Sequence, residues 1–195
     1  MGNSFLPGTP VLMADGSAVP IERVREGDEV LATDPGTGHT EGQPVTDLIV
    51  GNGEKDLVKV GVDVDGDSGD RIASVTATDQ HPFWTDSLDQ WTNAADLEPG
   101  MTLRTDSSAP TRVDAVTSWS ARTQEVRNLT VAGTHTYYVL ASGTALLVHN
   151  AAPCRLITSA IGKYSLLAKA AHQAGRNQTV QRDLDGSSSS CPVET

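Results

Sequence analysis

A series of short β-prone segments, separated by turn residues, constrains the fold of this chain more than any other feature of its sequence. Each segment alternates or concentrates apolar side chains and ends near glycine, proline or aspartate. The expected strands cover residues 9–13, 19–21, 28–32, 45–50, 57–64, 72–78, 101–103, 112–116, 125–131, 136–141 and 145–148. Before residue 150 only 94–97 favours a helix, and for one turn at most. Short strands at this spacing are typical of compact all-β domains.

The composition argues against several other classes of protein. With 18 glycines, 10 prolines and 4% aromatic residues, the chain does not resemble a helical bundle. A net charge of −11 disfavours a broad nucleic-acid surface. No run of about 18 apolar residues predicts a membrane span, and the first residues do not form a signal peptide. Cys154 and Cys191 are too few for a disulfide framework or a four-ligand zinc site on their own. We expect no metal and no cofactor.

The character of the sequence changes after Asn150. Residues 1–150 carry 9 basic and 22 acidic side chains, a net charge of −13, whereas residues 151–195 carry 5 and 3, a net charge of +2. The later part is rich in alanine, leucine and glutamine and ends near four consecutive serines, which favours interrupted helix followed by a flexible end. We therefore expect a domain at 2–150 and a less ordered segment at 151–195.

Four motifs occur in order along residues 2–150. They read NSF, GTPVLMADGS and PIERVREGDEVLA within 3–32, TDQHPFW over 78–84, VRNLTV and HTYYV within 126–139, and LLVHN over 146–150. Together they resemble the Hint domain, the self-processing module of inteins and hedgehog proteins, and most of all the bacterial pretoxin Hint domains of polymorphic toxins. The resemblance implies an all-β, pseudo-twofold horseshoe of short strands that brings the two ends of the domain together.

Asn150 ends the last motif and is able to cleave the peptide bond that follows it. Its side-chain amide can attack its own backbone carbonyl, close a succinimide ring and expel the next amine. Because the attack is intramolecular, catalysis needs mainly geometry and proton transfer, which an imidazole supplies near neutral pH. His149 directly precedes Asn150 and can polarise the scissile carbonyl, and the resemblance assigns His135 to activating the Asn150 amide. An isolated His-Asn pair would more simply be a polar strand end; the other motifs favour the function.

Thr78 and His81 form a T-x-x-H pattern. The resemblance implies that both contact the peptide bond at the upstream end of the domain, His81 donating to the departing nitrogen and Thr78 fixing the carbonyl. The spacing alone is equally compatible with a histidine that closes a turn before Pro82.

Three positions depart from the pattern of a splicing protein. An acyl shift needs a cysteine, serine or threonine at the first domain position, where this chain has Gly2. Ala151 also lacks a nucleophile, so ligation of flanking segments is not expected. Asn128 stands where inteins commonly place an acidic residue, and we keep it as a supporting position. Cleavage after Asn150 is the reaction that remains.

The expected substrate is therefore the chain's own C-terminal segment, released by a monomeric domain in a single turnover. Residues 151–195 resemble the truncated start of a toxin module, and the family context implies a larger precursor that is secreted or exported by a bacterium. Two alternatives stay open. The domain could be an inactive β scaffold that presents the tail, as Gly2 suggests, or the acidic segment 63–70 could bind calcium, although it lacks the sixth-position glycine and twelfth-position glutamate of a calcium loop.

Overall fold

The computed structural model describes residues 3–66, 69–107 and 109–150. Gly2 and the expected C-terminal segment, 151–195, lie outside the described residues. The strands are β1 (Pro10–Leu12), β2 (Ala18–Pro20), β3 (Glu29–Thr33), β4 (Thr40–Gly51), β5 (Lys55–Asp63), β6 (Ile72–Thr78), β7 (Pro82–Thr85), β8 (Gln90–Asn93), β9 (Thr102–Leu103), β10 (Thr111–Ala121), β11 (Val126–Val131), β12 (Thr136–Ala141) and β13 (Thr144–His149). This confirms the all-β class.

Two short 3-10 turns, η1 (Ile21–Arg23) and η3 (Ala94–Asp96), interrupt the strands. The second confirms the single helical turn expected at 94–97. Over the part of the chain that the structure describes, no helix has the length and apolar character needed to cross a membrane.

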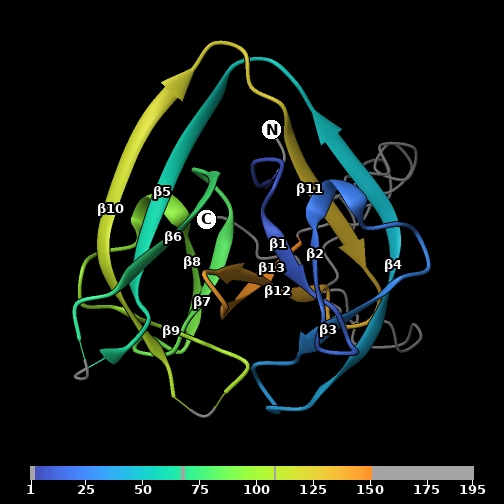
Figure 1. Cartoon of the computed structure of the whole chain (residues 1–195), viewed down its shortest axis with the longest axis horizontal. Helices are drawn as coiled ribbons and strands as arrows, with labels where there is room; N and C mark the ends of the chain where they lie inside the picture. The colour runs from blue at the N-terminus through green and yellow to red at the C-terminus, as the bar shows by residue number, and fades with distance from the viewer. Residues whose placement is uncertain (1–2, 67–68, 108, 151–195) are drawn as a thin grey trace, which may run out of the picture. The chain divides into compact units, whose positions relative to one another are not determined.

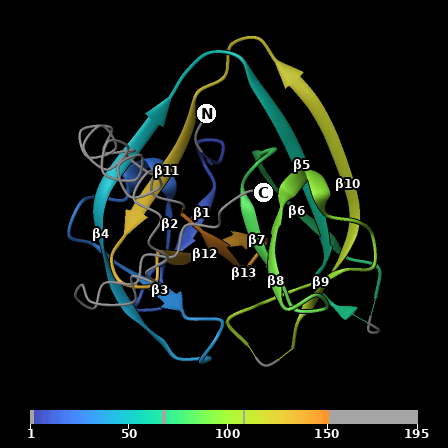
Figure 2. The same ribbon diagram turned by 180° about the vertical axis from the view of Figure 1, so that it is seen from behind.

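Antiparallel pairing arranges the strands in two sheets. The larger has ten strands in the order β2-β1-β12-β13-β7-β9-β10-β5-β6, with β8 beside β7, and the smaller has the order β11-β4-β3. Two long ribbons, β4 with β11 and β5 with β10, rise on opposite sides and converge at their tips, while β12 and β13 cross between them lower down (Figure 1). Figure 2 shows the same arrangement from behind. The strands thus form the expected horseshoe around the central β12–β13 hairpin.

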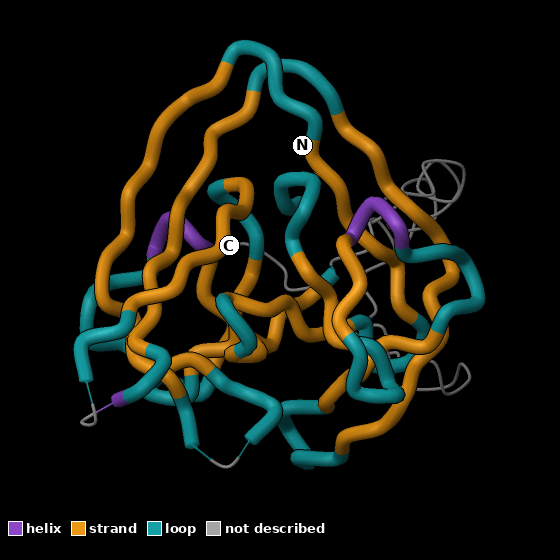
Figure 3. The backbone as a smooth tube through the Cα atoms, viewed as in Figure 1, coloured by secondary structure: helices purple, strands orange, loops and turns teal. Residues whose placement is uncertain are grey.

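The two halves of the horseshoe repeat one local structure. In each, a 3-10 turn leads to a glycine in the left-handed region, Gly27 with φ 87° and Gly100 with φ 96°. The Gly27 amide donates to the Val45 carbonyl at 2.8 Å, and the Gly100 amide donates to the Val113 carbonyl at the same distance. Figure 3 shows the two turns on opposite sides of the body. This correspondence is the pseudo-twofold relation that the resemblance implied; no repeat of fixed period reveals it in the sequence.

The central hairpin is buried on both faces. Tyr137 and Val139 point into the main apolar core, whereas Tyr138 belongs to a smaller cluster on the other face. This explains why 136–141 and 145–148 read as continuous apolar runs, the pattern of a strand covered on both sides. Phe5 is fully buried in the main core and bridges β6 and β11 through Ala77 and Arg127. The start of the domain is thereby fixed against strands far away in the sequence.

Two strands were missed by the sequence analysis and two were expected to be shorter. β7 and β8 have four residues each and contain proline, glutamine and asparagine, so they carry little apolar pattern. β4 and β10 extend well beyond the expected ranges 45–50 and 112–116 into polar, exposed residues. Pairing with a neighbouring strand, and not side-chain burial, forms these extensions.

Candidate active site of a self-processing domain

The β12–β13 hairpin gathers three of the expected site residues at its open end. Ser142 and Gly143 both have positive φ, 47° and 94°, which is the geometry of a two-residue turn with strong strand twist. This register places His149 opposite Thr136. Just beyond the pair, the backbone N–H of Asn150 donates to the His135 carbonyl at 2.8 Å. The tight turn at the other end of the hairpin therefore determines which residues meet at the site, about 20 Å away along the six residues of β13 at about 3.3 Å per residue.

Asn150 has a buried side chain with unused hydrogen-bonding capacity. The residue is 2% exposed, and neither its Oδ1 nor its Nδ2 has a hydrogen-bond partner among the described residues. A buried amide left in this state costs about 1–3 kcal/mol, and an orphaned polar group of this kind calls for an explanation. The Asn150 side-chain amide thus lies just after β13 without a hydrogen bond to any described residue.

His149 packs against the ring of Trp91, which lies on β8. The imidazole and the Trp91 ring have centroids 5.1 Å apart and planes inclined by 60°. The His135 and His149 centroids are 6.3 Å apart. Burial, and then the charge of His135, lowers the pKa of His149 to about 4. The His149 imidazole is therefore neutral at neutral pH, with one nitrogen donating and the other accepting.

Thr78 binds the upstream end of the domain. The Thr78 Oγ1 accepts from the Ser4 amide at 3.0 Å, and the Thr78 amide donates to the Ser4 carbonyl at 2.8 Å. Both partners are buried. The T-x-x-H pattern thus holds the backbone near the upstream end, although the bonds reach Ser4 and the expected position, Gly2, lies outside the described residues.

His81 packs against this upstream segment and is fully buried. Its ring centroid is 4.1 Å from that of Phe5, and neither ring nitrogen has a hydrogen-bond partner within the described ranges. Burial, and then the charge of His149, lowers the pKa of His81 to about 3. One bridge between β13 and β7, Val148 with Phe83, links the two histidine-bearing segments. The neutral imidazoles of His81 and His149 therefore lie on linked segments, with Phe5 near one end of the described domain against His81 and Asn150 at the other end following His149.

Asn128 is fixed by a tyrosine that the sequence analysis did not single out. Its Oδ1 accepts from the Tyr137 hydroxyl at 2.7 Å and from the Leu129 amide at 2.8 Å. Burial raises the pKa of Tyr137, so its hydroxyl remains a neutral donor. With its oxygen occupied, and without an ionisable group, Asn128 cannot take up a proton as a carboxylate would. The HTYY run was the available sequence signal for this partner.

The acidic segment that resembled a calcium loop uses its carboxylates within its own turn. Asp63 Oδ1 accepts from the amides of Asp65 and Gly66, and Asp65 Oδ1 accepts from the Arg71 amide. Over the residues described here, no group of three or more histidine, cysteine, aspartate or glutamate side chains is placed to hold a metal ion. These contacts favour a solvated acidic turn.

The buried histidines predict a specific dependence of stability on pH. Because the folded-state pKa values of His81 and His149, about 3 and about 4, lie below the ordinary histidine value of 6.5, the unfolded chain binds more protons between these values. Stability is therefore expected to fall as pH decreases below 6.5, by up to about 1.4 kcal/mol per pH unit for each histidine. Urea unfolding of the Asn150→Ala chain between pH 7 and pH 5 measures this slope.

A matched pair of variants makes that experiment specific. His39 is exposed and lies 3.3 Å from Glu41, so His39→Ala should leave the slope as it is, whereas His81→Gln should reduce it. A free energy of unfolding that stays constant between pH 6.5 and pH 5 would contradict the burial of two neutral imidazoles.

The arrangement as a whole defines a class of protein. The curled all-β body, with His81 against Phe5 near one end of the described domain and His149 before Asn150 at the other, is that of an intein-like self-processing domain. The family model described as pretoxin Hint domain matches residues 11–151, and the chain belongs to this family. No curated protein sequence matches the chain.

Solved structures agree with this fold. A bacterial intein-like domain from Clostridium thermocellum is 28% identical, with a TM-score of 0.65 over 75% of this chain and 98% of that one. A DnaB intein from Synechocystis sp. PCC 6803 is 20% identical, with a TM-score of 0.62 over 77% and 99%. A DnaX mini intein from Spirulina platensis is 20% identical, with a TM-score of 0.59 over 75% and 99%. At 20% identity the two inteins show the fold alone.

Proposed function

We propose that this domain cleaves its own chain after Asn150 and so releases the segment that follows. The observation that carries the proposal is the buried Asn150 amide, which has no hydrogen-bond partner among the described residues and lies next to a neutral imidazole. The Asn150 Nδ2 attacks the Asn150 carbonyl carbon and loses a proton. The bond to the Ala151 nitrogen breaks, the nitrogen takes up a proton, and residue 150 becomes a C-terminal succinimide.

We assign distinct roles to the two histidines at the hairpin end. A neutral His149 can donate from one nitrogen to the scissile carbonyl or the leaving nitrogen. His135 is exposed, so its imidazole can exchange protons with water while it accepts a proton from the Asn150 side-chain amide. The His135 backbone carbonyl accepts from the backbone N–H of Asn150 and keeps the reacting residue in place. Each proton transfer of this kind contributes about 10²–10⁴-fold.

The backbone at His135 allows a substitution that removes only its imidazole. Its φ is 56°, in the left-handed region, which asparagine, aspartate and histidine adopt more readily than other non-glycine residues. The position closes a turn in which the His135 amide donates to the Ala132 carbonyl at 3.5 Å. Asparagine also fits this backbone, so it can replace histidine without straining the turn.

His135→Asn tests this assignment without disturbing the turn. We expect cleavage to slow by about 10²–10⁴-fold, because the general base is lost, while the free energy of unfolding stays equal or rises slightly. Ser142→Asn is the matched control, since Ser142 also has positive φ, 47°, at the far end of the hairpin. A His135→Asn chain that cleaves at the wild-type rate would remove His135 from the mechanism.

Upstream chemistry is left out of the proposal. Glycine at position 2 offers no nucleophile for an acyl shift, and alanine at position 151 offers none for ligation. We assign Thr78 to holding the upstream backbone, as its bonds to Ser4 support, and His81 to packing against Phe5 in the same segment. The released segment, the monomeric state and the origin in a larger exported toxin precursor remain parts of the proposal that rest on the family resemblance.

A fusion experiment tests the proposal in the cell. A folded reporter placed after Thr195 should be released from the wild-type domain together with residues 151–195. Release should depend on Asn150 and proceed without added thiol, because no thioester is involved. Release that requires thiol, or that persists in the Asn150→Ala fusion, would contradict cyclisation.

A further inference from the structure

The Trp91 ring contacts His149, the histidine that directly precedes Asn150. Trp91 is partly buried on β8, and its ring centroid is 5.1 Å from that of His149, within the range of favourable aromatic pairs. Neither composition nor the T-x-x-H and His-Asn motifs draws attention to it. The contact nevertheless joins β8 to the end of β13 at the reacting residue.

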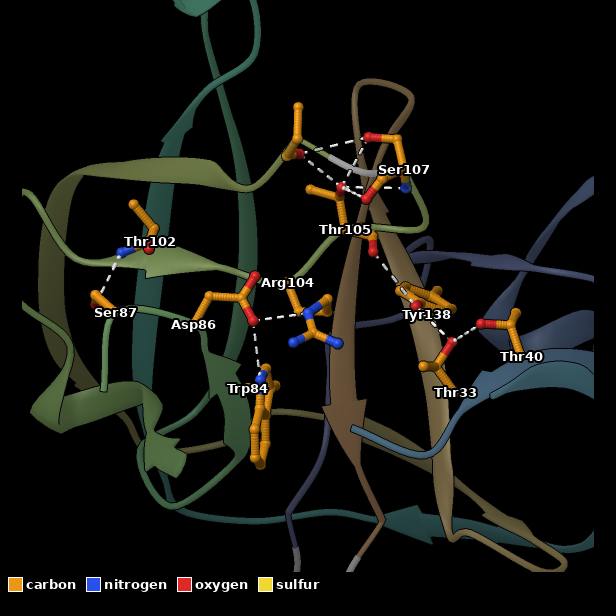
Figure 4. Close-up of polar contacts among 11 residues, drawn as sticks. Thr33, Thr40, Trp84, Asp86, Ser87, Thr102, Arg104, Thr105, Ser107 and Tyr138 are labelled. Carbon is orange, nitrogen blue, oxygen red and sulfur yellow. Dashed lines mark hydrogen bonds and ion pairs between the residues drawn. The ribbon is translucent and has the colours of Figure 1, made fainter. Parts of the chain in front are cut away.

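Several contacts fix the position of Trp91. Trp84 lies opposite it in the β7–β8 register, with ring centroids 5.1 Å apart and planes inclined by 78°. The Trp84 Nε1 donates to Asp86 Oδ1 at 3.0 Å, and the Arg104 Nε donates to the same oxygen at 2.6 Å. Figure 4 shows Asp86 between Trp84 and Arg104. An ion pair therefore holds the first tryptophan, and the first tryptophan supports the second.

The smaller apolar cluster completes this support. It contains Trp84, Tyr138 and Leu147, and Trp91 packs against it. Leu147 is two residues before His149 and so lies on the same face of β13. The Leu147 amide also donates to the Arg104 carbonyl at 3.0 Å. Trp91 is thus one of the partly buried residues packed against this cluster, and its ring contacts the His149 imidazole.

We propose that Trp91 is a positioning residue of the self-cleaving site, whose indole ring shields His149 from water and restricts its imidazole to one orientation beside Asn150. The inference rests on the proposed function for its catalytic meaning, although the contact itself does not. In the absence of the indole, the imidazole would gain both solvent and rotamer freedom.

The charged and titratable groups around His149 make this effect measurable. His135 faces it from the start of β12, and His81 is the titratable group nearby on the β6–β7 turn. Neither neighbour is a carboxylate, so neither stabilises a charged His149. Exclusion of water is then the main reason that His149 stays neutral, and we assign part of that exclusion to the Trp91 ring in contact with it.

The experiment follows His149 by NMR in the full chain carrying Asn150→Ala, which cannot cyclise. The imidazole proton shifts should remain those of the neutral ring from pH 8 down to pH 5. Adding Trp91→Ala should raise the protonation midpoint by about one pH unit or more, and Trp91→Phe by less. Trp119→Ala is the control, because Trp119 is 41% exposed on β10 and should leave the midpoint unchanged.

Trp91→Leu protects the test against simple loss of packing. It keeps apolar volume but no ring, so a purely structural role predicts a normal midpoint with changed stability, whereas the positioning role predicts a raised midpoint. In chains that retain Asn150, Trp91→Ala should slow cleavage roughly 10-fold or more at pH 6, since misplacement of a reacting group is costly. An unchanged midpoint in both Trp91→Ala and Trp91→Leu would overturn the inference.

The two readouts separate this inference from the proposed function. If the midpoint shifts but the wild-type chain never cleaves, the contact between Trp91 and His149 stands and the proposed function fails. If the wild-type chain cleaves and Trp91→Ala alters neither midpoint nor rate, the proposed function stands and Trp91 is removed from the site.

Discussion

Asn150→Ala is expected to abolish cleavage after residue 150, because no other group can form the succinimide. The substitution should not harm folding. It removes a 2%-exposed amide with no hydrogen-bond partner among the described residues, and deleting such a group is neutral or stabilising. The expected result is therefore a chain that stays full-length and whose stability equals or exceeds that of the wild type. Gel electrophoresis over days follows the chain length.

A second asparagine provides the control for this experiment. Asn52 is exposed and precedes Gly53, whose φ is 111°, in the turn between β4 and β5. Asn52→Ala should leave cleavage unchanged. Continued cleavage at the same bond in Asn150→Ala would show that cyclisation is not the reaction.

His149→Ala is expected to slow cleavage by about 10²–10⁴-fold, equivalent to roughly 3–5 kcal/mol of barrier. The residue is the polar neighbour directly before the scissile residue, and it is neutral because burial lowers its pKa to about 4. The wild-type rate should therefore decline as pH falls through about 4, where His149 becomes charged, and this decline should be missing from the slow residual rate of the variant.

His39→Ala is the control for the imidazole substitution. Its side chain is 68% exposed and pairs with Glu41 at 3.3 Å on the body's surface. The His39→Ala chain should cleave at the wild-type rate at every pH. A His149→Ala chain with wild-type rate and pH profile would assign the proton transfers to other groups.

Much of the fold could be predicted from residue patterns because the central strands are buried on both faces. The runs at 136–141 and 145–148 correspond closely to β12 and β13, and the alternating run at 72–78 corresponds to β6, whose burial alternates along the strand. β7 and β8 could not be predicted in this way. Their four-residue lengths carry no periodic signal, and they exist because β13 and β9 pair with β7 from the sides.

The site shows the same division between local pattern and tertiary contact. The His-Asn pair, His135 and the T-x-x-H pattern could be recognised as sequence motifs, and the structure places them around the two ends of the described domain. Trp91 and Tyr137 could not be assigned, because their roles come from contacts across strands: the Trp91 ring against His149, and the Tyr137 hydroxyl on Asn128 at 2.7 Å. An aromatic residue in a β-rich sequence is ordinarily core packing, and only the distance to a polar partner distinguishes these two.

The most direct measurement is the intact mass of the purified full-length chain, followed at neutral pH beside Asn150→Ala. The account predicts that the wild-type chain divides into 1–150 and 151–195, and that the larger fragment first appears lighter by one water than the hydrolysed peptide, as a C-terminal succinimide requires. The rate can be slow, on a scale of hours to days, since Gly2 removes any upstream step. A wild-type chain that keeps its full mass indefinitely, indistinguishable from Asn150→Ala, would contradict self-cleavage and leave an inert β scaffold in its place.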